Sequence, residues 1–301
     1  MAAISNNTYL NILASYAYIG NSKRFEDTIF ANTQSGRINA MLDSGAYTLH
    51  SAKTKKTFLN LDDYCTFLEK KGHYFEKYVN FDVINNDKQS KDNYEKMLCR
   101  GFNPMFVFTN YDTDFKYLQY AAKQNEHICV SGGQLSNRKW LLKRYQDVYK
   151  YTKAKIHGLA FVKYPDMLRV PLHSVDSSTW VLSAGAFGNL HWYDNGIKRM
   201  AYIEVLKNKS SMPKVLTDTL DKFKVSVKEF SNLQNHRNGR SIGVFLSIIA
   251  YLEYQKYCKK NDLNLFLACG NNSQVDNILF VDEHLTNNTL TYEKFKKKNS
   301  C

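Results

Sequence analysis

The sequence lacks the hallmarks of membrane-spanning and secreted proteins. No uninterrupted apolar run approaches the roughly 18 residues that a membrane-spanning helix needs. The longest candidate, Ile242–Leu252, soon meets Glu253 and Lys256. The N-terminal residues contain no basic segment followed by an apolar one, so we expect no secretory signal. We therefore expect a soluble protein that works in the cytoplasm, without a membrane partner.

The sequence also lacks a metal-binding cluster. Its six cysteines are scattered, with no pair two or three residues apart, and no histidine stands close enough to complete a zinc site. We therefore expect no metal cofactor, and reduced thiols of which several fill core space. Neither an internal repeat nor a Gly-rich dinucleotide-binding fingerprint occurs along the chain.

Positive charge and apolar residues, in contrast, are abundant. Lys and Arg number 41 against 28 Asp and Glu, which gives a net charge of +13, and 44% of the 301 residues are hydrophobic. The apolar content is sufficient for a substantial core in one or two domains. The charge predicts a polyanionic partner, and nucleic acid is the first candidate. The many Lys, Asn and Tyr residues favour an AT-rich genome such as that of a virus, in which case the protein would work in the host cytoplasm.

Short apolar runs alternate with longer amphipathic stretches over the first part of the chain. We expect strands at Leu10–Tyr18, Ile38–Leu42, Tyr78–Phe81, Met105–Phe108, His127–Val130, Ile156–Phe161 and Leu172–Val175. We expect helices at Leu61–Lys71, Ser90–Arg100, Asp114–Gln124 and Asn137–Thr152. This alternation predicts a parallel sheet, and strands so short favour a (β/α)8 barrel of the TIM type over an open, doubly wound sheet.

The pattern changes after Ser183. We expect residues 1–188 to hold the barrel core with the catalytic motifs, and residues 189–301 to complete the barrel and add a basic, helical C-terminal extension. Within the second part, Arg240–Lys260 predicts a helix and Leu263–Cys269 a last strand or a buried turn. The basic run Lys294–Lys298 is either a solvated end or a contact for phosphates.

Three of the expected strands finish on an aspartate: Asp43, Asp82 and Asp176. In a (β/α) barrel the C-terminal ends of the strands meet on one face, so these carboxylates would share a pocket. Carboxylates brought together there repel one another and lose hydration, which proteins tolerate mainly at functional sites. The alternative is that each aspartate only caps the turn or helix that follows it.

Small residues and aromatic residues accompany these aspartates. Asp43 is followed by Ser44-Gly45-Ala46-Tyr47, a turn that allows close approach of another molecule and would place Tyr47 at the rim of the pocket. Gly132 and Gly133 follow another expected strand and either leave bare amides for a flat ligand or form a tight turn. The pair His157-Gly158 serves either packing or chemistry.

These motifs follow the order seen in the tRNA-guanine transglycosylase superfamily. The segments that carry the resemblance are Leu42-Asp-Ser-Gly-Ala-Tyr47, Asn80-Phe-Asp82, Ser131-Gly-Gly133, His157-Gly158 and Ser174-Val-Asp-Ser-Ser-Thr-Trp180. The last of these resembles the phage and bacterial branch that inserts 7-deazaguanines into DNA. The resemblance covers roughly residues 10–188.

The resemblance implies a role for each residue of these motifs. It implies that Asp176 is the nucleophile, that Asp43 is the general acid and base, and that Asp82 recognises the edge of guanine. The other residues would bind the base: Tyr47 on one face, His157-Gly158 over the other, and Ser44, Gly132 and Gly133 around it. The substrates would then be DNA and a free 7-deazaguanine base.

Two departures from the superfamily bear on the nucleic-acid substrate. The enzymes that act on tRNA carry a zinc site of three cysteines and a histidine, and nothing comparable follows Asp176. The strand Met105–Asn110 also lacks the glutamine that those enzymes place there. Both departures favour DNA. The alternatives are base exchange on tRNA, a barrel that only binds nucleic acid or a partner subunit, and an unrelated barrel hydrolase.

Overall fold

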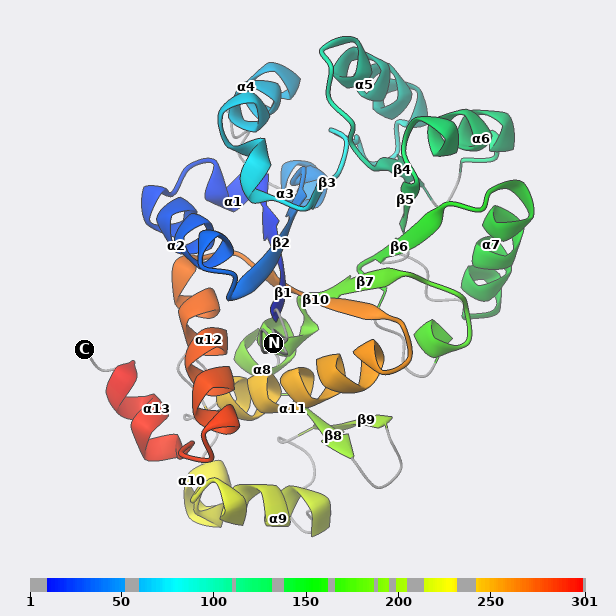
Figure 1. Cartoon of the computed structure of the whole chain (residues 1–301). Helices are drawn as coiled ribbons and strands as arrows, with labels where there is room; N and C mark the ends of the chain where they lie inside the picture. The colour runs from blue at the N-terminus through cyan, green and yellow to red at the C-terminus, as the bar shows by residue number, and fades with distance from the viewer. Residues whose placement is uncertain are drawn as a thin grey trace, which may run out of the picture. The chain divides into compact units, whose positions relative to one another are not determined.

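The computed structural model describes residues 10–51, 60–109, 112–131, 138–161, 166–186, 189–194, 199–204, 214–231 and 242–299. The predicted (β/α)8 barrel is confirmed: parallel strands form one eight-stranded sheet, and helices connect successive strands (Figure 1). In hydrogen-bonded order the strands are β3 Lys77–Tyr78, β2 Ile38–Asp43, β1 Leu10–Ser15, β10 Asn264–Cys269, β7 Ser174–Ser177, β6 Lys155–Leu159, β5 His127–Ser131 and β4 Phe106–Phe108.

A single bridge joins the two end strands of this order, β3 and β4. Val79 pairs with Met105 in parallel. The amide of Met105 donates to the carbonyl of Tyr78 at 2.9 Å, and the amide of Asn80 donates to the carbonyl of Met105 at 3.0 Å. The sheet therefore closes on itself. Strand β3 has 2 residues, so its hydrogen-bonded pairing is shorter than the expected strand Tyr78–Phe81 would have made.

The side chain of Asn80 joins β3 to β4 beyond the point where their backbone pairing ends. Its Oδ1 accepts a hydrogen bond from the amide of Val107 at 2.8 Å, and its Nδ2 donates to the carbonyl of Ser90 at 3.2 Å. Asn80 is fully buried, so these bonds satisfy backbone groups that water does not reach. One amide side chain thus links the end of β3 both to β4 and to the helix that lies between β3 and β4 in the chain.

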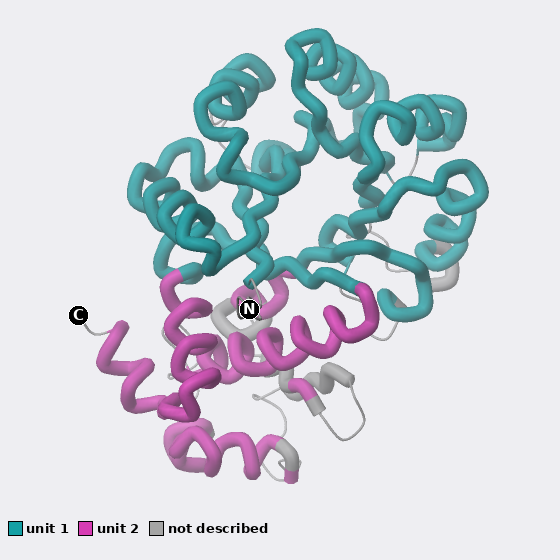
Figure 2. Tube along the Cα trace, viewed as in Figure 1, with its two compact units in different colours: residues 1–176, 263–275 teal, residues 177–262, 276–301 magenta. Residues whose placement is uncertain are grey.

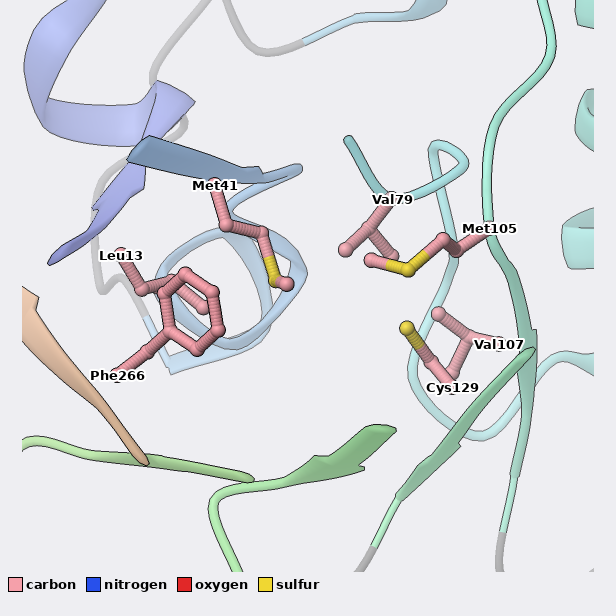
Figure 3. Close-up of a cluster of buried hydrophobic side chains, with 7 residues drawn as sticks. All are labelled: Leu13, Met41, Val79, Met105, Val107, Cys129 and Phe266. Carbon is pink, nitrogen blue, oxygen red and sulfur yellow. The ribbon is translucent and has the colours of Figure 1, made fainter. Parts of the chain in front are cut away.

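Apolar side chains fill the inside of the barrel. Figure 3 shows side chains that point inward from the strands and their ends: Leu13, Met41, Val79, Met105, Val107, Cys129 and Phe266. Successive side chains of a strand point to opposite faces, so residues two positions further along point the same way. Ser15, Asp43 and Ser131 stand in this relation to Leu13, Met41 and Cys129. A polar layer therefore follows the apolar one toward the C-terminal ends of the strands.

Helices connect these strands, and polar side chains cap several of them. The helices are α1 Tyr16–Ile19, α2 Lys23–Gln34, α3 Ala46–Ser51, α4 Leu61–Lys71, α5 Asp87–Cys99, α6 Phe115–Gln124 and α7 Arg138–Tyr151. Each capping side chain accepts a hydrogen bond from the backbone amide three residues later. The caps are Ser22 for α2, Asn60 for α4, Asn86 for α5 and Asp114 for α6. Helix α4 has the expected bounds, whereas α5 begins three residues earlier than expected because Asn86 caps it.

The chain divides into two compact units (Figure 2). Unit 1 comprises residues 1–176 and 263–275, and unit 2 comprises residues 177–262 and 276–301. The last barrel strand, β10, corresponds to the expected strand Leu263–Cys269, so unit 1 takes chain from both sides of residue 188. No helix among the described residues is long and apolar enough to cross a membrane.

The C-terminal third is largely helical, as expected. Its helices are α8 Thr179–Ala186, α9 Lys214–Lys222, α10 Val227–Ser231, α11 Ile242–Lys259, α12 Asn272–Thr286 and α13 Tyr292–Lys298. An antiparallel hairpin of β8 Asn189–Asp194 and β9 Arg199–Glu204, which the sequence did not predict, accompanies them. Helix α11 is buried around most of its circumference and contacts α8 and β8 within unit 2.

Candidate active site

Asp43 is the last residue of β2 and lies in the polar layer of the barrel. Its Oδ2 accepts a hydrogen bond from the amide of Gly45 at 2.9 Å, so the capping role considered for it is real. Burial, followed by the negative charge of Asp176, raises the pKa of Asp43 from 3.8 to about 6. A carboxyl with this pKa can both release and accept a proton near neutral pH.

The turn after Asp43 requires glycine at one position. Gly45 has φ +90°, and a Cβ there would lie 2.7 Å from the Cβ of Ala17 on α1. This close approach brings the turn against α1 and fixes the start of α3. Tyr47, in the first turn of α3, is 69% exposed. An aromatic ring is therefore accessible close to Asp43 in the chain.

Asp82 follows the barrel closure at the end of β3. The hydroxyl of Ser44 donates to Asp82 Oδ1 at 2.7 Å, which ties the β2–α3 turn to the loop after β3. Burial, followed by the negative charge of Asp43, raises the pKa of Asp82 from 3.8 to about 7. The amide of Asp82 itself donates to the carbonyl of Asn80 at 2.8 Å, so the closure residue also holds this loop.

Asp176 lies on β7 and is 7% exposed. Its Oδ1 accepts from the amide of Ala160 at 2.7 Å and lies 3.3 Å from Nε2 of His157. Ala160 has φ +51°, an unusual conformation for a residue with a Cβ, and this conformation accompanies an amide that points at the carboxylate. No described residue donates a hydrogen bond to the second oxygen, Oδ2. One oxygen of Asp176 is thus anchored, and the other is available.

His157 contacts Asp176 from inside the barrel. Its side chain has no exposed surface, and its Nδ1 lies 2.8 Å from the hydroxyl of Ser174. The ring packs edge-on against Phe266, with 6.1 Å between the ring centroids. The neighbouring Gly158 faces the opposite way, where a Cβ would lie 2.8 Å from the hydroxyl of Tyr145. Whether the His157-Gly158 peptide lies over a bound base stays a prediction.

The three carboxylates form one electrostatic group. The charge of Asp176 raises the pKa of Asp43, and the charge of Asp43 raises that of Asp82. All three act on the buried thiol of Cys129, in the apolar layer, whose pKa is raised well above 9.0 by burial and then by these charges. The aspartates at the ends of three separate strands therefore share one side of the barrel, above its apolar layer.

Some candidate residues lie outside the described part of the chain, and some contacts had no sequence signal. Gly132 and Gly133 belong to the undescribed residues 132–137. Ser174 stands within a recognised motif, but nothing in the sequence indicated its bond to His157. The donor from Ala160 to Asp176 is a backbone amide, which every residue except proline has, so the residue type does not predict this contact. Among the described residues, no group of three or more His, Cys, Asp or Glu could hold a metal ion.

We compared the chain with protein-family models and with curated proteins, and neither comparison found a match.

Proposed function

We propose that this protein is a base-exchange glycosyltransferase that replaces guanine in DNA by a 7-deazaguanine derivative. The observation that carries the proposal is the pairing of two unlike carboxyl groups. Asp176 has one oxygen held by two neighbours and the other available, whereas Asp43 has a pKa raised to about 6. A nucleophile and a proton carrier are the two groups that retaining sugar transfer requires.

The first half-reaction breaks the bond between the sugar and guanine. Oδ2 of Asp176 forms a bond to C1′ of the deoxyribose while the bond from C1′ to N9 breaks. The electron pair of that bond goes to the guanine, and Asp43 donates a proton to the departing base. A carboxyl whose pKa lies near the working pH is suited to this transfer.

The second half-reaction reverses these steps with a different base. The entering 7-deazaguanine gives its N9 proton to Asp43, and N9 attacks C1′. The bond between C1′ and Asp176 breaks, and its electron pair returns to the carboxylate. The covalent intermediate must survive while the bases exchange, so the site must keep water from C1′. The apolar layer beneath the carboxylates supports this requirement.

Asp82 and Tyr47 are suited to hold the base. An ionised Asp82 accepts hydrogen bonds from the N–H groups on the edge of guanine, with Ser44 fixing its other oxygen. The pKa of about 7 means that ionisation of Asp82 accompanies binding near neutral pH. Tyr47 is 69% exposed, and an exposed aromatic ring can stack on a base. These groups lie within a barrel, so the target nucleotide must leave the duplex to reach them.

DNA is the proposed nucleic acid because of the charge and the sequence departures described above. The net charge of +13 suits a protein that grips phosphates on both sides of a flipped nucleotide. The decisive measurement incubates the protein with a labelled 7-deazaguanine and either duplex DNA or tRNA, followed by mass spectrometry of the nucleosides. Label in tRNA alone would identify the tRNA enzyme instead. Release of guanine without incorporation would indicate a hydrolase.

The covalent step is tested by removing its nucleophile. Asp176→Asn should abolish the protein–DNA adduct that wild-type protein forms when the entering base is withheld. Asp43→Asn should slow exchange by a factor of about 100 or more, the usual contribution of a general acid and base. Asp147→Asn, a carboxylate on α7 paired with Lys150, is the matched control and should leave both unchanged. Wild-type exchange by Asp176→Asn would refute the mechanism.

A further inference from the structure

We infer that His157 and Ser174 are positioning residues that decide which oxygen of Asp176 attacks the sugar. The inference rests on the proposed function, because it assigns the orientation of that nucleophile. It is carried by a buried chain of contacts in which Ser174 Oγ lies 2.8 Å from His157 Nδ1, and His157 Nε2 lies 3.3 Å from Asp176 Oδ1.

The chemistry of the three groups fixes the direction of each hydrogen bond. A carboxylate oxygen only accepts, so Nε2 of His157 must carry the hydrogen that faces Asp176. In a neutral imidazole Nδ1 then holds a lone pair and must accept. The hydroxyl of Ser174 can donate, and it is the group that faces Nδ1. The chain therefore runs from Ser174 O–H to Nδ1, and from Nε2–H to Asp176 Oδ1.

The opposite tautomer would weaken the site. With its hydrogen on Nδ1, the ring would donate to Ser174 and turn the lone pair of Nε2 toward Asp176 Oδ1. Two acceptors would then face each other at 3.3 Å inside the barrel, where little water is present to screen them. Asp176 would keep only the Ala160 amide as a donor to Oδ1 and could rotate.

The barrel holds the ring in this orientation. His157 and Ser174 are direct partners in the register of the neighbouring parallel strands β6 and β7. Asp176 stands two residues after Ser174 on β7, and so points to the same face. The edge-on contact with Phe266 of β10 limits rotation of the imidazole. Ser174 is 3% exposed, which leaves little room for water to replace its hydroxyl.

Anchoring Oδ1 has a direct consequence for the reaction. Both held contacts of the carboxylate go to Oδ1, so Oδ2 is the oxygen left to form the bond with C1′. Ser174 acts on the carboxylate through the imidazole ring, and no hydrogen bond joins the two directly. The resemblance implied a base-facing role for His157, and this inference adds a role toward the nucleophile.

The first test measures the tautomer directly in the protein without substrate. Nitrogen NMR of the 15N-histidine-labelled protein should show His157 with a protonated Nε2 and an unprotonated Nδ1, the signal being assigned by its loss in His157→Gln. Ser174→Ala should change this pattern, whereas Ser174→Thr, which keeps a hydroxyl, should preserve it. A wild-type ring protonated on Nδ1, or on both nitrogens, would overturn the inference, whether or not the variants fold.

The second test measures the rate of covalent adduct formation with DNA. Ser174→Ala should lower this rate about 10- to 100-fold, the loss that removal of the hydrogen-bond partner of a metal-bound histidine causes. The KM for DNA should stay unchanged, and Ser174→Thr should restore the rate. Thr152→Val removes a buried hydroxyl that accepts from the amide of Ala154, before β6, and is the matched control. An equal, small effect of both substitutions would overturn the inference.

The two tests separate this inference from the proposed function. If the wild-type protein forms no adduct with DNA but Ser174→Ala still switches the tautomer, the proposed function fails and the Ser174–His157–Asp176 chain stands as a description of the site. If the wild type forms the adduct and Ser174→Ala changes neither tautomer nor rate, the positioning role fails and the proposed function stands.

Discussion

Replacing Asp82 by asparagine is expected to stabilise the protein at neutral pH, with an advantage that disappears near pH 4. In the folded protein the pKa of this carboxyl is raised from its ordinary 3.8 to about 7, by burial and by Asp43. The folded state thus keeps a proton that the unfolded chain releases above pH 3.8. A folded state that binds more protons loses stability as the pH rises.

The size of the effect follows from the same shift. Each tenfold change in proton affinity corresponds to about 1.4 kcal/mol, so the shift from 3.8 to about 7 corresponds to at most about 4 kcal/mol. The cost grows as the pH rises from about 4 to about 7 and is constant above that. Asparagine keeps an oxygen that can accept from Ser44 and carries no charge at any pH, so Asp82→Asn removes the cost.

Urea unfolding of the wild type and of Asp82→Asn at a series of pH values measures this difference. Asp114→Asn is the control, because the stability difference that it causes should change with pH in the opposite direction. Hydrogen bonding to the amide of Tyr117 lowers the pKa of Asp114, so its charged form stabilises the folded state at neutral pH and this contribution is lost at low pH. A stability difference between the wild type and Asp82→Asn that does not change with pH would refute the reasoning.

Two further predictions concern the residues that shape the site. Gly45→Ala should lower the free energy of unfolding by about 2–4 kcal/mol, because a positive φ and a steric clash with Ala17 combine. Gly101→Ala, where φ is +82° but no atom lies within 4 Å, should cost only about 1–2 kcal/mol in the same urea assay. The side-chain amides of Asn80 and Asn125 each bridge two backbone groups. Replacing either by alanine should therefore lower the free energy of unfolding by about 2–4 kcal/mol. In the exchange assay only Asn80→Ala should raise the KM for the free base, because the loss of its side-chain bonds loosens the backbone at residue 80, to which the amide of Asp82 donates. An equal rise in both variants would contradict this role.

The fold was predictable because its signals are local. Polar residues such as Asn60 stand before amphipathic stretches and mark where helices begin, and short apolar runs mark the strands. The prediction was wrong where a tertiary contact decides. The strand expected at Tyr78–Phe81 ends early because the Asn80 side chain replaces the ladder. Helix α2, Lys23–Gln34, was missed for another reason, because its cap Ser22 is a local signal that the sequence analysis did not use.

The candidate site divides in the same way. Asp43, Asp82 and Asp176 could be placed together because the topology of a barrel brings the ends of its strands to one face. The contact between His157 and Asp176 depends on the register between β6 and β7, which no spacing along the chain reveals. The contact from the amide of Ala160 to Asp176 depends on one unusual backbone angle, which an alanine in the sequence does not indicate.

If the proposed function holds, the closure of the barrel through Asn80 offers a way to change the accepted base without altering a residue proposed to contact it. Beyond the backbone bridge between Val79 and Met105, one amide side chain joins the end of β3 to β4. The amide of Asp82 donates a hydrogen bond to the carbonyl of the same residue, Asn80. A longer amide, as in Asn80→Gln, is expected to move β4 away from residue 80 and so to shift the Asp82 loop relative to Ser44. Selection for new substrates could therefore act on the wall of the barrel while its acidic groups stay fixed.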